Sequence, residues 1–168
     1  MDFLRGGTLV AATLTTGLMA GLFYSFSVSV MPGLAQNDDR TFVGGMQGIN
    51  RAIQNGWFFL SFMGALLLGA AALFFHLRGG ATKAVPWIVV GLALYVVVLV
   101  ITFALNIPLN NELEAAGNGH PDGIADLAAV RKHFESSWVA WNNIRTIVNT
   151  AAFGSLMWAL VQYGKTVA

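Results

Sequence analysis

The sequence predicts an all-α integral membrane protein, a bundle of four transmembrane helices with a short amphipathic helix in the first outer loop. Of its 168 residues, 56% are hydrophobic and only 10% are charged, whereas a soluble domain carries about 25% charged residues. About 20 apolar helical residues cross a bilayer, and charge-free windows of at least that order occur four times. Lipid offers no partner to a free backbone N–H or C=O, so these windows must be helical. We therefore expect one four-helix transmembrane domain over residues 1–168.

The four charge-free windows locate the spans. They cover residues 6–37, 52–75, 84–111 and 146–164. Without their polar ends, we expect helices near residues 8–31, 57–77, 86–105 and 144–163. The first window is far longer than the apolar region of a signal peptide, and Asp2 replaces the usual basic lead-in. We therefore expect it to remain as a span.

Basic residues in short loops predict the orientation, because such loops stay in the cytoplasm. The turn between the second and third spans holds Arg78 and Lys83 and no acid, and the termini add Arg5 and Lys165 against Asp2. The other two loops hold five basic residues and seven acids, namely Arg40, Arg51, Arg131, Lys132 and Arg145 against Asp38, Asp39, Glu112, Glu114, Asp122, Asp126 and Glu135. The sequence predicts a multi-pass protein of the plasma (inner) membrane with both termini cytoplasmic.

The first outer loop carries the signals of a short amphipathic helix. Asp38 and Asp39 can cap a helix that begins near Arg40. Its apolar stripe is formed by Phe42, Met46, Ile49 and Ile53, and a neighbouring face carries Gln47, Asn50 and Gln54. Two interpretations stay open. The helix lies on the bilayer or caps the bundle, or it is a lid over a cavity between the spans.

The second outer loop begins with two amides around a proline. Pro108 ends or kinks the third span and frees backbone carbonyls. Asn106 and Asn110 are four residues apart, so a continuing helix puts both amides on one side. These amides either cap the helix end or hold a polar ligand or an oxyanion, and both alternatives stay open.

The most informative helix face leads into the fourth span. Trp138, Asn142, Arg145 and Asn149 stand at positions i, i+4, i+7 and i+11, and Trp141 is four residues before Arg145. The tryptophans suit an interfacial belt, and Arg145 could snorkel. Asn149 lies inside the span, where an unpaired amide is costly and polar groups normally face the bundle interior. The row favours a functional site. If Arg145 pairs with Glu112 or Glu114, replacing Arg145 leaves a partly buried charge without its partner and should destabilise the protein.

Several kinds of chemistry are excluded. The chain has no cysteine, which removes disulfides, thiolate metal sites and iron–sulfur clusters. A net charge of +1 leaves no basic surface for nucleic acid. No span carries a central pair of histidines for a haem, since His76 lies at a span end and the other two lie in the outer loop. The loop group of His120, Asp122, Asp126 and His133 matches no familiar metal site. We expect no metal.

Four sequence blocks, in order along nearly the whole chain, resemble the anthrone oxygenase-like family of small four-span membrane proteins. They are Ala20-Gly21-Leu22-Phe23-Tyr24-Ser25-Phe26 with Val30-Met31-Pro32-Gly33-Leu34, Met46-Gln47-x-Ile49-Asn50-x-x-Ile53, Asn106-x-Pro108-x-Asn110-x-x-Leu113, and Trp138-x-x-Trp141-Asn142-x-x-Arg145-Thr146. Most members are uncharacterised bacterial membrane proteins, and the name comes from a subset that acts on polyketide anthrones. The sequence departs from the pattern at Asn143, where many relatives carry a histidine.

The resemblance implies a cofactor-independent anthrone-type monooxygenase with dioxygen as co-substrate and neither metal nor flavin. Such a reaction needs a base, donors to an oxyanion and a dry, flat pocket. The expected base is His133 or Glu112, and Asn142 and Arg145 are the expected catalytic donors. The expected substrate-binding residues are Asn50, Asn106, Asn110, Trp138, Trp141, Asn149 and Tyr24.

The expected partners are membrane lipid and a hydrophobic aromatic small molecule, in a pocket near the outer leaflet. The alternative function is a non-enzymatic four-span module that binds a quinone or lipid or assembles with partner membrane proteins, and a small transporter is a third candidate. The sequence leaves open whether the chain forms a homo-oligomer.

Overall fold

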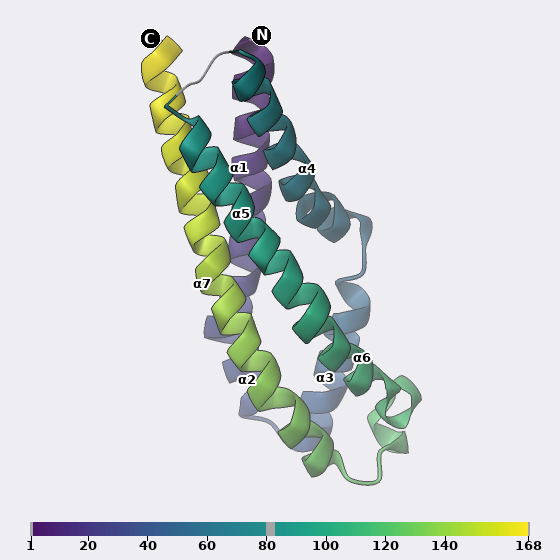
Figure 1. Cartoon of the computed structure of the whole chain (residues 1–168). Helices are drawn as coiled ribbons and strands as arrows, with labels where there is room; N and C mark the ends of the chain where they lie inside the picture. Colours follow the sequence, from purple (N-terminus) through teal and green to yellow (C-terminus); the bar gives the residue numbers. More distant parts are fainter. Residues whose placement is uncertain (1, 80–82, 168) are drawn as a thin grey trace. The chain divides into compact units, whose positions relative to one another are not determined.

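The computed structural model describes residues 2–79 and 83–167. It is 92% helix, with no strand among those residues. Four helical segments are long and apolar enough to cross a membrane, and they cover Asp2–Ala35, Gly56–Arg78, Val85–Gly119 and Leu127–Thr166 (Figure 1). The predicted all-α class is confirmed, and the four segments indicate a multi-pass membrane protein.

The helices follow one another with few interruptions. In chain order they are α1 (Asp2–Ser25), the π-helical turn η1 (Phe26–Val30), α2 (Met31–Ala35), α3 (Asp39–Ala52), α4 (Gly56–Arg78), α5 (Val85–Ile101), the π-helical turn η2 (Thr102–Asn106), α6 (Ile107–Ala115), the 3₁₀ turns η3 (Ala116–Gly119) and η4 (Pro121–Gly123), and α7 (Leu127–Val167). They form two compact units. Unit 1 comprises Met1–Leu22, Gly56–Val98 and Ile147–Ala168, and unit 2 comprises Phe23–Asn55 and Leu99–Thr146.

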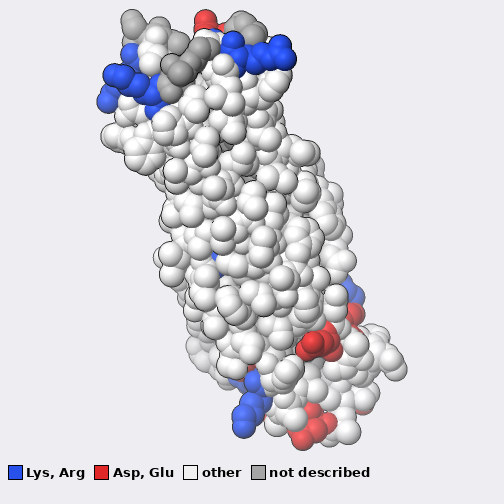
Figure 2. Space-filling model, in the orientation of Figure 1, with Lys and Arg blue, Asp and Glu red and all other residues white. Residues whose placement is uncertain are grey.

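Unit 1 is a bundle with an apolar core. Leu9 of α1, Ala72 of α4, Ile88 of α5 and Leu156 of α7 are all buried in it. Both chain termini lie at one end of this bundle, as Figure 1 shows. The charged residues of unit 1 gather at the same end (Figure 2), and they are Arg5, Arg78, Lys83, Lys165 and Asp2. The body of unit 1 is therefore free of charge, as a membrane-spanning segment requires.

Unit 2 contains the predicted amphipathic helix, α3. Asp38 caps it, since its Oδ1 accepts a hydrogen bond from the N–H of Thr41 at 2.8 Å. The buried face differs in part from the predicted stripe. Ile49 and Ile53 are only half-buried, whereas the buried residues are Phe42, Val43, Met46, Gln47 and Asn50. The reason is that α3 packs against protein on its amide side as well.

Polar contacts fasten α3 to the rest of unit 2. The side-chain Nε2 of Gln47 donates to the carbonyl of Leu113 in α6 at 2.8 Å. Arg51 pairs with Glu114 at 2.7 Å, and Arg40 at the other end of the helix pairs with Asp122. Polar contacts along its whole length therefore hold helix α3 against the rest of unit 2.

Both π-helical turns precede a proline by two residues, since η1 is followed by Pro32 and η2 by Pro108. A proline has no N–H and collides with the carbonyl four residues before it. The wider π turn shifts the hydrogen-bond register there, as in the bond from the N–H of Ile107 to the carbonyl of Thr102. The third predicted span therefore does not end near Leu105, and the helix continues to Ala115.

Candidate functional site

Three residues of the row predicted on the last helix, Trp138, Asn142 and Arg145, lie on the inner face of α7 in unit 2. Asp126 starts this helix by accepting a hydrogen bond from the N–H of Ala129 at 2.9 Å. Trp138 is 2% exposed, Asn142 is fully buried and Arg145 is 7% exposed. The periodic spacing thus places an indole, an amide and a guanidinium in the interior of unit 2.

Asn142 and Arg145 are hydrogen-bonded to each other in the interior of unit 2. The Nε and Nη2 atoms of Arg145 donate to Asn142 Oδ1 at 3.1 and 2.9 Å. The amide nitrogen of Asn142 donates to the carbonyl of Phe23 at 3.2 Å and to Ser27 Oγ at 2.9 Å. The guanidinium carbon lies 4.1 Å from the ring centre of Phe23 and 5.4 Å from that of Trp138.

The sequence left open whether Arg145 pairs with Glu112 or Glu114, and the structure gives both acids other partners. Glu112 pairs with His133, and Glu114 pairs with Arg51. Among the residues that the structure describes, no carboxylate forms a salt bridge with Arg145. The physical reason is that both acids lie near the C-terminal end of α6, where exposed basic groups compete for them.

The two amides around Pro108 lie on one side of a continuing helix, as their spacing indicated, and both contact Trp138 of α7. Asn110 Oδ1 accepts a hydrogen bond from the indole Nε1 of Trp138 at 2.7 Å. Asn106 Nδ2 donates weakly to the backbone carbonyl of Trp138 at 3.4 Å. The Oδ1 of Asn106 is buried without a partner in the described part of the chain. Trp138 is therefore held in place from the side of η2 and α6.

An open pocket of about 290 Å³ lies between α6 and the beginning of α7. Its lining consists of Leu109, Glu112, Leu113, Ala116, Ala129, Val130, His133 and Phe134. All of these side chains are apolar except Glu112 and His133, whose Oε2 and Nε2 atoms are 3.1 Å apart. Both are well exposed, at 59% and 72%. The pocket thus has an apolar lining with one carboxylate–imidazole pair, Glu112 and His133.

This pair has the arrangement of a general base with an orienting group. A carboxylate that accepts a hydrogen bond from one imidazole nitrogen fixes the tautomer and stabilises the imidazolium that forms when the other nitrogen takes a proton. Phe134, on the inner wall of the pocket, stacks on Trp138 with ring centres 5.9 Å apart. An aromatic row therefore leads from the pocket to Arg145.

Of the eleven predicted site residues, only Glu112 and His133 line the pocket. Tyr24 is 57% exposed, and Trp141 is half-buried on α7. Asn50 is buried on α3. Asn149 belongs to unit 1, where neither of its amide atoms has a hydrogen-bond partner among the described residues.

The loop residues weighed for a metal have separate partners. Asp122 pairs with Arg40, Asp126 caps α7, and His133 pairs with Glu112. Within residues 2–79 and 83–167, no group of three or more His, Asp or Glu side chains gathers that could hold a metal ion.

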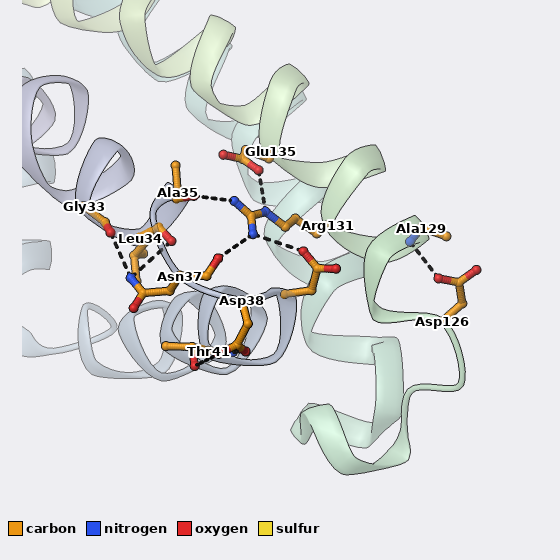
Figure 3. A network of polar contacts seen from close by, with 11 residues as sticks. Gly33, Leu34, Ala35, Asn37, Asp38, Thr41, Asp126, Ala129, Arg131 and Glu135 are labelled. Carbon is orange, nitrogen blue, oxygen red and sulfur yellow. Dashed lines mark hydrogen bonds and ion pairs between the residues drawn. The ribbon is translucent and has the colours of Figure 1, made fainter.

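One polar residue that the sequence reading did not single out is Arg131 of α7 (Figure 3). Its Nη2 donates to the carbonyl of Ala35 at 2.9 Å, and its Nη1 donates to the carbonyl of Asn37 at 2.9 Å and to Asp39 at 3.0 Å. Its Nε donates to Glu135 at 2.7 Å. Only the pairing with Glu135, four residues along the helix, has a signal in the sequence.

A comparison with protein families found a match to the family model described as anthrone oxygenase, over residues 57–155. The match includes the pocket and the row on α7, but it excludes Tyr24 and α3. Searches among the curated proteins and among the solved structures gave no match.

Proposed function

Because this chain belongs to the anthrone oxygenase family, we propose that it is a membrane-bound oxygenase that oxidises a hydrophobic, electron-rich aromatic compound of the anthrone type with dioxygen. The aromatic substrate binds in the pocket between α6 and α7. Glu112 and His133 provide the base.

The proposed reaction converts the CH₂ group between the two aromatic rings of an anthrone into a carbonyl. The base removes one proton, and the resulting carbanion is stabilised as an enolate of the opposite carbonyl. One electron passes from this anion to dioxygen, and the two radicals combine in a C–O bond to give a peroxide. Loss of water from the peroxide leaves the quinone. The balance is one CH₂ group and one O₂ giving one C=O and one water, without a further reductant.

The observation that carries the proposal is the Glu112–His133 pair in an otherwise apolar pocket. In the tautomer that donates from Nε2 to Glu112, the lone pair on His133 Nδ1 is free to accept the substrate's proton. The carboxylate then stabilises the imidazolium. The apolar walls formed by Leu109, Leu113 and Phe134 suit a flat hydrocarbon.

We infer a location in the plasma membrane, and the charge distribution supports an orientation with both termini in the cytoplasm. The charged end of unit 1 has four basic residues and one acid, namely Arg5, Arg78, Lys83 and Lys165 with Asp2. Unit 2 carries the seven acids of the two long loops. These two loops also hold five basic residues, so they have an excess of acids, whereas the turn between the second and third spans has none. Since basic loops stay inside, the two long loops, one of which carries the pocket, lie on the outer side, where an apolar substrate can enter from lipid.

The test is oxidation by the purified chain in lipid nanodiscs. Oxygen uptake and quinone formation from emodin anthrone are compared with the spontaneous rate in empty nanodiscs. We expect a rate well above it, and a fall of about 10²–10⁴-fold in the catalysed rate for His133→Gln, the range for loss of a general base. His120→Gln is the matched control, because His120 is exposed and outside the pocket. A wild-type rate equal to the spontaneous one refutes the proposal.

A second candidate function is a non-enzymatic module that binds a quinone or lipid. The observation that favours it is the mutual pairing of Asn110 with Trp138 and of Asn142 with Arg145, since none of these four lines the pocket. The same nanodiscs distinguish the two functions. Binding of an anthraquinone without any catalysed oxygen uptake supports the module and excludes the oxygenase.

A further inference from the structure

The guanidinium of Arg145 is a buried charge that lacks a counterion within the described chain. It is 7% exposed and lies on α7 within a segment apolar enough to span a membrane. The groups that the structure places against it are Asn142 Oδ1 and the rings of Phe23 and Trp138. All three are neutral.

Neutral partners offset only part of the cost of burying this charge. Removing an ion from water costs several kcal/mol even after the protein relaxes. A cation–π contact returns part of that cost, and the Asn142 oxygen is shared by two N–H groups of the same guanidinium. Arginines in membrane-spanning segments normally have an anionic or carbonyl partner and mark ligand pathways. The environment of Arg145 is therefore electrostatically incomplete, and an anion would complete it.

The neighbouring rings indicate the shape of that anion. Trp138 contacts Phe26 at 5.5 Å and Phe134 at 5.9 Å between ring centres, and Phe134 lines the pocket. Flat ligands stack well against such a row. Phe134 and Trp138 are each 2% exposed, so a ligand that enters from the pocket must displace Phe134 to stack on Trp138 and bring an oxygen at its inner edge towards the guanidinium.

We propose that Arg145 is the anion-binding group of an inner site that takes the deprotonated oxygen, phenolate or enolate, of a flat aromatic ligand. This inference rests on the proposed function in one respect, because it assigns the anionic form of the same substrate class to this site. In the oxygenase reaction Arg145 stabilises the enolate oxygen after His133 has removed the proton, and Asn142 orients the guanidinium.

The experiment uses 2-hydroxyanthraquinone, whose visible absorbance distinguishes the phenol from the phenolate, and purified protein in phosphatidylcholine nanodiscs. The pH at which the bound dye ionises is measured for wild type, Arg145→Gln and Arg145→Lys. A neighbouring opposite charge lowers a pKa by about 1–3 units. We expect the midpoint in wild type to lie that far below the midpoint in Arg145→Gln, with Arg145→Lys close to wild type. Arg51→Gln, which removes an exposed partner of Glu114, is the control and should behave as wild type.

A second measurement needs no variant and so is unaffected if Arg145→Gln fails to fold. Wild type should bind the phenolate about tenfold or more tightly than 2-methoxyanthraquinone, as a shift of about 1 pH unit requires. Equal affinities, or equal midpoints in wild type and Arg145→Gln, overturn the proposal. Displacement of the dye by phosphatidylglycerol also overturns it, because the anion is then a lipid phosphate. The dye has no CH₂ group to oxidise, so this result is separable from the failure or success of anthrone oxidation.

Discussion

Replacing Arg131 by methionine tests how α3 is held in unit 2. Arg131 is the side chain that connects α7 to the corner between α2 and α3, through the carbonyls of Ala35 and Asn37 and the carboxylate of Asp39 (Figure 3). Methionine keeps an apolar stem that can still lie over the ring of Phe42, which the guanidinium now covers at 4.5 Å. The substitution therefore removes mainly the polar contacts.

The loss of stability expected for Arg131→Met follows from how exposed Arg131 and its partners are. The side chains of Arg131, Asp39 and Glu135 are 15%, 41% and 27% exposed, so each ion pair contributes at most about 1 kcal/mol. The two carbonyls are exposed, and water replaces part of each hydrogen bond of about 1 kcal/mol. We expect Arg131→Met to lower the free energy of unfolding by about 2–3 kcal/mol in total.

The assay is unfolding of the detergent-solubilised protein by sodium dodecyl sulfate, followed by circular dichroism, with hydrogen exchange of the α3 amides as a local readout. Lys132→Met is the matched control, because Lys132 is the next residue and is exposed. An exposed substitution of this kind changes stability by about 0.5 kcal/mol or less. Equal stabilities for the two variants, with unchanged α3 exchange, refute the reasoning.

Two further predictions concern single hydrogen bonds. Asn110→Leu leaves the buried indole N–H of Trp138 without its acceptor, and we expect a loss of about 1–3 kcal/mol in the same unfolding assay. Adding Trp138→Phe should recover part of that loss in a double-mutant cycle, and strictly additive losses contradict the bond. Hydrogen bonds from Thr41 hold the pKa of Asp38 below the value of 3.8 expected in the unfolded chain. The cap therefore stabilises α3 at higher pH and is lost as the pH falls through the lower, folded-state pKa. The Thr41 amide should lose exchange protection below about pH 3.8, whereas Asp38→Ala should lack it throughout, and a flat wild-type profile contradicts the prediction.

Local patterns in the sequence predicted much of the fold. Apolar runs predicted the spans because the length of a crossing is set by the bilayer, and Asp38 predicted the start of α3 because an N-cap bond spans only three residues. The spacing of Asn106 and Asn110 predicted that a continuing helix puts both amides on one side, and the structure adds that this side contacts Trp138 of α7. The sequence left open whether Pro108 ends or kinks the third span, because the continuation of that span into α6 depends on the π turn η2 and on carbonyl register rather than on composition.

Long-range contacts were the part that the sequence did not reveal. Arg145 has no acid beside it because Glu112 and Glu114 are engaged elsewhere, and no local pattern shows that competition. The partners of Arg131 in the corner before α3 are more than 90 residues away in the chain. Phe134 was also missed, since a phenylalanine on a helix reads as ordinary core until the pocket beside it is known.

The location of the aromatic substrate is the central claim, and two adjacent alanines test it directly. Ala129 lines the pocket, whereas Ala128 does not, and both are exposed. A phenyl ring at position 129 occupies much of the space of about 290 Å³. We predict that Ala129→Phe lowers kcat/KM for anthrone oxidation by more than about tenfold, equivalent to about 1.4 kcal/mol, whereas Ala128→Phe matches wild type. Equal kcat/KM values for the two variants would contradict the assignment of the pocket.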